Sequence, residues 1–114
     1  MRNREEEGRW SAGALLFSGR PDPIWPLDEN VALPLVRLWD ALSPSTAAKA
    51  AVTGLGYRGC FVRDALGHEW RAFRGIVESD RGGGREVRSD EKRAFEKAIL
   101  ATAPPGTLPA HLID

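Results

Sequence analysis

Three prolines within six residues place the strongest local constraint on how this chain can fold. Pro21, Pro23 and Pro26 lie in the segment 18–26, Ser-Gly-Arg-Pro-Asp-Pro-Ile-Trp-Pro, directly after an apolar run. Each proline fixes its own φ angle and biases the residue before it toward extended or polyproline II backbone. We therefore expect a stiff, pre-shaped loop, which loses less conformational entropy on binding than a flexible loop does.

The composition fits one small domain. The chain has 114 residues, of which 42% are hydrophobic, with four Trp, four Phe and one Tyr. This is enough for a modest core but leaves no room for a second domain. We expect a charged tail over residues 1–9, without the apolar run of a targeting signal, and a single α+β domain over residues 10–114.

Charge and cysteine content limit the partners and the compartment. Sixteen basic and sixteen acidic residues cancel at pH 7, so no overall field favours nucleic acid or an anionic membrane as a partner. No stretch has the length of apolar sequence that a membrane span needs. Cys60 is the single cysteine, which excludes an internal disulfide and favours a reducing, cytoplasmic location.

Hydrophobic spacing in the first half predicts a strand followed by a helix. The run 10–17 predicts the strand, and the helix begins at Asp28 or Asn30 and ends at Ser43-Pro44. A short helix is expected over 46–52. The apolar residues that recur at helical spacing in the long helix are Val31, Leu35, Leu38, Trp39 and Leu42.

The second half predicts a hairpin followed by a helix. Residues 57–64 and 68–78 are rich in β-branched and aromatic residues, and the turn Ala65-Leu66-Gly67 joins them. A brief strand is expected over 85–88. The last helix begins at Ser89-Asp90-Glu91 and carries Glu96 on its outer face, paired with Lys92 at i,i+4. Its buried stripe is Phe95, Ala98, Ile99 and Thr102.

These elements predict an α+β fold in the order β-α-(short α)-β-β-α. The sheet is expected to have three or four strands, with the helices packed mainly on one face. The sequence pattern leaves open whether the first strand pairs parallel or antiparallel with the hairpin.

Cys60 and His68 lie on the two strands of the predicted hairpin, which raises the question of a nucleophile and its base. The turn sets Asp64 opposite His68 and Cys60 opposite Ala72, so Cys60 is roughly 13 Å from His68. That distance is too long for a hydrogen-bonded dyad. We expect a small buried Cys60, a surface ion pair between Asp64 and His68, no metal site and no cofactor.

Arginines recur near aromatic residues and glycines. Along the hairpin, Arg58, Arg63, Arg71 and Arg74 alternate with aromatic side chains, an arrangement that can stack bases and hold phosphates. Interspersed carboxylates dilute this positive charge. Glycines 82–84 can form a backbone nest for an anion, although a mobile loop is the favoured interpretation.

The proline loop and the start of the hairpin form the favoured site. If the two segments lie side by side, Arg20, Asp22, Trp25, Tyr57 and Arg58 surround a shallow cleft. Two guanidinium groups and two aromatic rings there can clamp a carboxylate-bearing or planar ligand. The alternative role for Trp25 is structural, as a plug at one end of the core.

The same two stretches resemble a group of small, functionally uncharacterised, largely bacterial proteins. These proteins carry Ser-Gly-Arg-Pro-Asn-Pro-x-Trp after the first strand and Leu-Gly-Tyr-Arg-Gly later, and the matching residues here are 18–25 and 55–59. The helix end Leu100-Ala101-Thr102-Ala103-Pro104 is also similar. Asp22 stands where the group has Asn, which keeps an Asx-type turn but adds a charge. The resemblance implies one domain and points to these two segments, but it implies no reaction.

The sequence therefore favours a non-enzymatic binding or interaction module. It would use the proline loop and the Tyr57-Arg58 segment to hold a protein or a small anionic or planar ligand. The alternative is an enzyme or enzyme subunit with Arg20, Asp22 and Arg58 at a cleft. A nucleic-acid binder that uses the hairpin face is the third possibility. The oligomeric state is left open.

Overall fold

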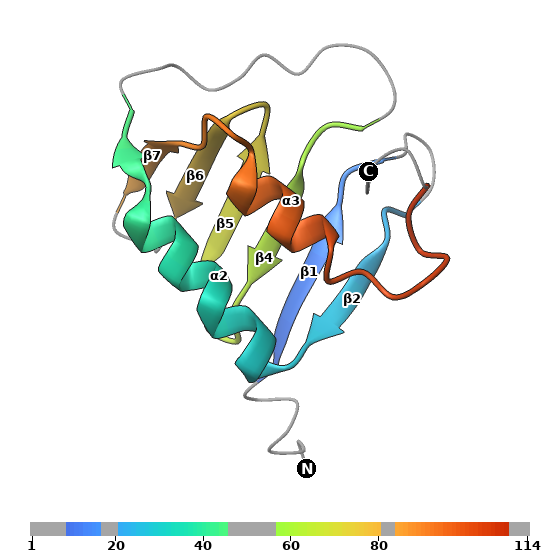
Figure 1. Cartoon of the computed structure of the whole chain (residues 1–114). Coiled ribbons are helices and arrows are strands. Elements are labelled where there is room, and N and C mark those ends of the chain that lie inside the picture. The colour runs from blue at the N-terminus through green and yellow to red at the C-terminus, as the bar shows by residue number, and fades with distance from the viewer. Residues whose placement is uncertain (1–8, 17–20, 46–56, 81–83, 110–114) are drawn as a thin grey trace.

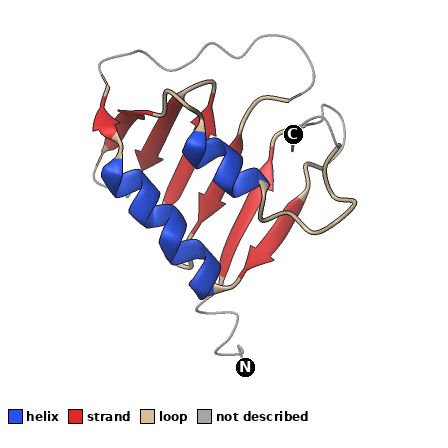
Figure 2. Ribbon diagram, in the orientation of Figure 1, coloured by secondary structure: helices blue, strands red, loops and turns tan. Residues whose placement is uncertain are grey.

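The fold is dominated by one large sheet. The computed structural model describes residues 9–16, 21–45, 57–80 and 84–109, in which seven strands pair antiparallel in the order β2-β1-β4-β5-β6-β7-β3 (Figure 1). The strands are β1 (Trp10–Ala14), β2 (Ile24–Leu27), β3 (Ser43–Pro44), β4 (Cys60–Arg63), β5 (Glu69–Phe73), β6 (Ile76–Asp80) and β7 (Arg85–Ser89). The helices α2 (Glu29–Ala41) and α3 (Ala94–Leu100) lie side by side in front of the sheet in the view of Figure 2.

This architecture shows that the predicted fold is wrong in its sheet. The protein has a sheet-rich fold of seven antiparallel strands with two helices, and not the predicted three- or four-stranded sheet. Two additional strands lie where the sequence pattern indicated loops, β2 in the proline segment and β3 directly after α2. A further strand arises because a turn at Arg74-Gly75 divides the predicted second hairpin arm into β5 and β6. The predicted helix 46–52 lies outside the described residues.

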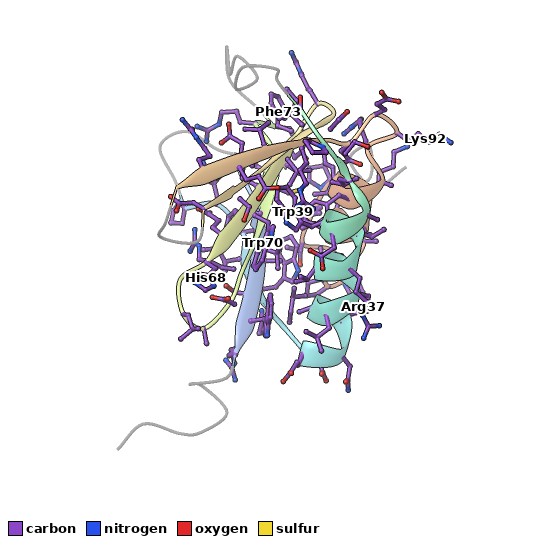
Figure 3. All side chains as sticks on the ribbon, turned by 90° about the vertical axis from the view of Figure 1, so that its left-hand side faces the viewer. Arg37, Trp39, His68, Trp70, Phe73 and Lys92 are labelled. Carbon is purple, nitrogen blue, oxygen red and sulfur yellow. The ribbon has the colours of Figure 1, made fainter. Side chains whose placement is uncertain are left out.

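Alternation along the strands turns one row of side chains toward the helices. Ala12, Val62 and Trp70 are paired across β1, β4 and β5, and all are buried. Helix α3 packs against these three strands and against α2. Trp39 of α2 and Trp70 of β5 lie between the helix layer and the sheet, whereas Arg37 points away from both (Figure 3). The core is therefore the layer between helices and sheet.

Helix α2 begins where the sequence indicates. Asp28 is its N-cap, and the Asp28 carboxylate accepts a hydrogen bond from the backbone N–H of Asn30 at 2.9 Å. Of the predicted stripe Leu35 and Trp39 are buried, whereas Val31 and Leu38 are 42% and 36% exposed and Ala32 is buried instead. Small Ala32 lets the helix lie close to its neighbours, which a count of large apolar residues overlooks.

The first edge of the sheet is the second half of the predicted proline loop. The N–H of Ala14 donates to the carbonyl of Pro23 at 3.2 Å, and the register continues through Trp25 opposite Ala12. Because antiparallel pairs alternate in their hydrogen bonding, Pro26 occupies a position whose backbone nitrogen faces away from β1. Pro26 has no N–H to offer on that free edge.

The other edge repeats this arrangement. The N–H of Ser45 donates to the carbonyl of Val87 at 3.0 Å, and Pro44 lies opposite Arg88. By the same alternation, the nitrogen of Pro44 faces away from β7. Each edge strand thus lacks a backbone donor at one outward position.

The predicted hairpin turn is confirmed, although the second arm ends at Phe73 instead of continuing to residue 78. Strands β4 and β5 pair with Cys60 opposite Ala72, and Phe61 and Val62 are both buried on opposite faces. The Asp64 carboxylate closes the turn, because it accepts from the N–H of His68 and pairs with His68 Nδ1, both at 2.9 Å.

Neither of the two described helices is long and apolar enough to cross a membrane.

Candidate functional site

Trp25 is part of the core rather than of an open cleft. The side chain is 3% exposed, and its indole N–H donates to Thr102 Oγ1 at 2.9 Å, just after α3. Strand β1 lies between β2, which carries Trp25, and β4. The burial of Trp25 fits its alternative, structural role, with its ring packed inside the core. Arg20 lies outside the described residues.

Asp22 and Arg58 bring the two predicted segments together. One Asp22 oxygen accepts from the N–H of Leu16 at 2.7 Å, and the other lies 3.9 Å from the Arg58 guanidinium. Both side chains are partly exposed. The proline segment and the residues before β4 therefore meet at one end of the sheet, just beyond the end of β1, the strand that separates β2 from β4.

A bulge positions the residues before β4. The N–H of Arg58 donates to the carbonyl of Leu15 at 2.7 Å, and the N–H of Leu15 donates to the carbonyl of Gly59 at 2.8 Å. Two residues thus lie opposite one, which bends the strand and re-aims the side chains around it. Gly59 has φ +115°, and a Cβ there would lie 2.8 Å from the carbonyl oxygen of Ala72, so the close approach needs glycine.

Glu96 is the centre of a buried polar cluster at the same end of the sheet. Its side chain is 0% exposed. Oε2 accepts from the Tyr57 hydroxyl at 2.5 Å and from Arg93 Nη2 at 2.8 Å. Oε1 accepts from Arg93 Nε and from the backbone N–H of Arg74, both at 3.1 Å. Four donors therefore satisfy this carboxylate, as a buried charge requires.

Arg74 and Arg93 share an uncommon backbone conformation. Their φ angles are +51° and +57°, and they are the two non-glycine residues with positive φ in the described part of the chain. Such conformations cost free energy and persist where the surroundings enforce them. Both residues bond to the same Glu96 carboxylate, one through its backbone and the other through its side chain. The buried charge thus holds two arginines in place.

The guanidinium groups of these arginines differ in their contacts. That of Arg74 lies over the ring of Phe73, 4.9 Å from its centroid, and the Tyr57 ring meets Phe73 edge-on at 5.9 Å between centroids. Within residues 9–16, 21–45, 57–80 and 84–109, the Arg74 guanidinium forms no hydrogen bond or ion pair. The Arg93 side chain is 45% exposed although one of its edges binds Glu96. We call Tyr57, Arg58, Arg74, Arg93 and Glu96 the arginine end.

The environment shifts the pKa values of three other groups here, Tyr57, Cys60 and Arg93. Burial raises the pKa of the Tyr57 hydroxyl, and the nearby Cys60 and Glu96 raise it further. Burial also raises the pKa of the Cys60 thiol, which the hydrogen bond with Tyr57 opposes in part. The hydrogen bond to Glu96 raises the pKa of Arg93, so Arg93 stays charged. Cys60 itself is buried, as predicted.

Two further arginines of the predicted hairpin, Arg63 and Arg71, are engaged with a carboxylate. Arg63 and Arg71 lie 3.2 and 3.4 Å from Glu69 Oε1, and Arg63 also lies over the ring of Phe61 at 4.4 Å. Arg85 lies 3.6 Å from Glu78. Of the predicted glycine nest, Gly84 is described and the residues before it are not.

Sequence reasoning does not place Glu96, Arg93 and Arg74 in this site: it assigns Arg74 to the hairpin face and Glu96 to the outer face of the helix. Glu96 does not lie on the outer face of α3, and its partner is Arg93 rather than Lys92. A signal was present, because Leu100 follows Glu96 by four residues and is buried on the same side of the helix. Asp90 adds to it: the Asp90 carboxylate accepts from the N–H groups of Phe95 and Glu96, so α3 begins in the orientation that turns Glu96 inward.

No protein-family model matches this chain, and neither a curated protein nor a solved structure is significantly similar to it. The functional reading therefore depends on the geometry of the arginine end.

Proposed function

We propose that the protein is a non-enzymatic binding module that holds an anionic ligand, or an acidic segment of a protein partner, at the arginine end. The observation that carries this proposal is that two arginines in a costly backbone conformation share one buried carboxylate. Strained residues concentrate at functional sites, where the surrounding structure stabilises them. Arg58 of the arginine end lies 3.9 Å from the carboxylate of Asp22, which borders this surface.

The contacts of Arg74 support an anionic ligand. Its exposed guanidinium is stacked on Phe73, which orients its plane while leaving its N–H groups in need of acceptors. Oriented guanidinium groups bind carboxylate and phosphate oxygens in pairs, with charge-assisted hydrogen bonds. The N–H donors of Arg74 are already positioned before an anion binds, which lowers the entropy cost of binding.

The pKa directions support binding rather than catalysis. A general base or nucleophile needs a pKa near the working pH. The raised pKa values of Tyr57 and Cys60 keep both groups protonated at neutral pH. Tyr57 and Cys60 are therefore suited to a structural role and not to proton transfer or nucleophilic attack.

A nuclear magnetic resonance titration of the isotope-labelled protein tests the proposal. Inorganic phosphate, benzoate and a glutamate-rich hexapeptide are added separately, with chloride at equal ionic strength as the control. We expect at least one anion to give saturable shifts at the backbone amides of Tyr57, Gly75 and Glu96. Arg74→Gln should abolish them, whereas Arg37→Gln, which removes an exposed arginine of α2, should not. Shifts that are absent, scattered, or equal in both variants would contradict the proposal.

A further inference from the structure

We infer that the group bound at the arginine end is a single carboxylate, held by the outer edge of Arg93 and by Arg74. This inference rests on the proposed function and names its ligand class. Glu96 acts as a positioning residue, because it binds the inner edge of Arg93 and the backbone of Arg74.

The first argument is the donor arrangement of Arg93. A guanidinium carries five N–H groups, and Arg93 uses one on Nε and one on Nη2 for Glu96. The remaining donors, on Nη1 and Nη2, form the end-on fork. Two parallel N–H groups in one plane match the two oxygens of a carboxylate. Since the Arg93 side chain is 45% exposed, a ligand can reach this fork without breaking the pair with Glu96.

The second argument is the proximity of Arg74. The N–H of Arg74 and the Nε of Arg93 both bond to Glu96 Oε1, each at 3.1 Å, so the two donors lie within two hydrogen-bond lengths of each other. The Arg74 guanidinium extends over Phe73, beside the Tyr57 ring that Glu96 also holds. We therefore assign the role of second cation to Arg74, whose backbone shares the Glu96 carboxylate with Arg93.

The third argument is the charge balance. Glu96 neutralises one of the two arginines, and Asp22 neutralises Arg58. Among these five side chains one positive charge remains, and the buried Asp90 carboxylate, which accepts from the N–H groups of Phe95 and Glu96, offsets it further. A phosphate dianion would bring an excess negative charge close to a carboxylate that is fully buried, where screening by water is weak. The site thus favours a planar monoanion over a tetrahedral dianion.

Three ligands with the same ring test this inference: benzoate, phenylphosphate and benzamide. In titrations of the whole chain at pH 7.5, we expect benzoate to bind about tenfold more tightly than phenylphosphate. Benzamide, which keeps the planar shape without the charge, should give no saturable shifts at Tyr57, Gly75 or Glu96. Arg93→Lys removes the fork but keeps a charge, and it should weaken benzoate binding by about tenfold. Arg37→Lys is the matched control.

The outcomes separate the two proposals. If neither benzoate nor phenylphosphate perturbs the arginine end, this inference fails, and if no other anion does so either, the proposed function fails with it. If phenylphosphate binds as tightly as benzoate or more tightly, only the carboxylate assignment is overturned. Equal binding of benzamide would also overturn it. If the spectrum of Arg93→Lys loses the dispersion of a folded protein, Arg74→Gln replaces it as the test, because this variant leaves Glu96 and its partners in place. Unchanged benzoate affinity of Arg74→Gln would exclude Arg74 as the second cation.

A carboxylate can come from a free small acid or from the C-terminus of a peptide. An acetylated tripeptide with a free C-terminus, and the same tripeptide with an amidated one, distinguish these sources. Loss of binding on amidation supports the carboxylate assignment, and the ratio of tripeptide to benzoate affinity identifies the preferred source. Equal binding of the two tripeptides, in place of such a loss, would count against the assignment.

Discussion

The hydroxyl of Tyr57 donates to Glu96 Oε2 at 2.5 Å and so joins the bulge before β4 to the first turn of α3. Tyr57 and Glu96 are far apart in sequence, and each has a second anchor: Tyr57 meets Phe73 edge-on, and Glu96 holds Arg93. Three loops therefore depend on one carboxylate. The stability of the fold and the shape of the candidate site are coupled at this point.

We expect Glu96→Gln to destabilise the protein by about 2 to 3 kcal/mol. The variant keeps the size of the side chain, but its amide nitrogen faces the donors of Arg93 and Tyr57, and one buried donor is left without an acceptor. Urea unfolding followed by tryptophan fluorescence measures the change. Glu91→Gln, at an exposed position before α3, is the matched control and should change stability by less than about 0.5 kcal/mol. Equal losses in both variants would contradict the central role of Glu96.

Stability should fall as the pH rises above about 10, the ordinary pKa of tyrosine. Burial, and then Cys60 and Glu96, raise the pKa of Tyr57, so the folded protein keeps a proton that the unfolded chain releases. The contribution is fully present below the unfolded pKa and is lost above it. Tyr57 is the single tyrosine, so the near-ultraviolet absorbance of tyrosinate reports it directly. Tyrosinate that forms near pH 10 while the protein is still folded would contradict the prediction, and Tyr57→Phe should flatten the high-pH part of the stability curve.

The bond between Trp25 and Thr102 should contribute measurably beyond the burial of the ring. We expect Trp25→Ala to cost about 3 to 5 kcal/mol, because a fully buried aromatic side chain is removed. A double-mutant cycle with Trp25→Phe and Thr102→Val isolates the hydrogen bond, whose coupling energy should be about 1 kcal/mol. A coupling energy of zero would show that the ring is held by packing alone.

A side chain at position 13 should destabilise the folded protein. A Cβ at this position would lie 2.5 Å from Phe61 Cζ and 2.8 Å from the carbonyl oxygen of Pro23. We expect Gly13→Ala to destabilise the protein by about 1 to 3 kcal/mol. Adding Phe61→Leu should recover part of this loss, since it removes the ring but not the backbone contact. If Gly13→Ala is neutral in urea unfolding, β1 and β2 are farther apart than the structure has them.

The edge prolines should keep molecules from pairing edge to edge. Pro26→Thr and Pro44→Thr each restore an outward N–H on an edge strand. We expect the double variant to sediment with a larger concentration-dependent mass than the original protein, while its unfolding midpoint changes little. Pro105→Thr, in an exposed turn after α3, serves as the control. Identical sedimentation of all three proteins would show that the prolines do not limit association.

Local sequence signals predicted the elements that local interactions determine. Asp28 caps α2, Asp90 orients the start of α3, and the hairpin turns where Gly67 supplies a positive φ. The number of strands was underestimated because proline in segment 21–26 reads as a loop, and only an edge position makes it compatible with a strand. Arg74 ends β5 in a conformation that sequence propensity disfavours.

The sequence brought only part of the candidate site together, because the remaining contacts depend on the tertiary fold. The meeting of Asp22 with Arg58 follows from two segments that flank neighbouring strands. Glu96 could not be placed by charge alone, because a glutamate on a helix is ordinarily exposed. Its burial depends on donors supplied by three separate loops, which only the tertiary fold brings together.

The strand order has a consequence for how the molecule is assembled. Strands β4 to β7 follow one another along the chain as a meander. The two edge strands of the whole sheet, β2 and β3, both belong to the stretch from Ile24 to Pro44, with α2 between them. The meander can form early from neighbouring segments, but its outer strands β4 and β7 stay open until β1, β2 and β3 dock. Closure of both sides is therefore a late, long-range event in folding. Conditions that slow it, such as loss of the α2 contacts around Trp39, should favour aggregation over completion of the sheet.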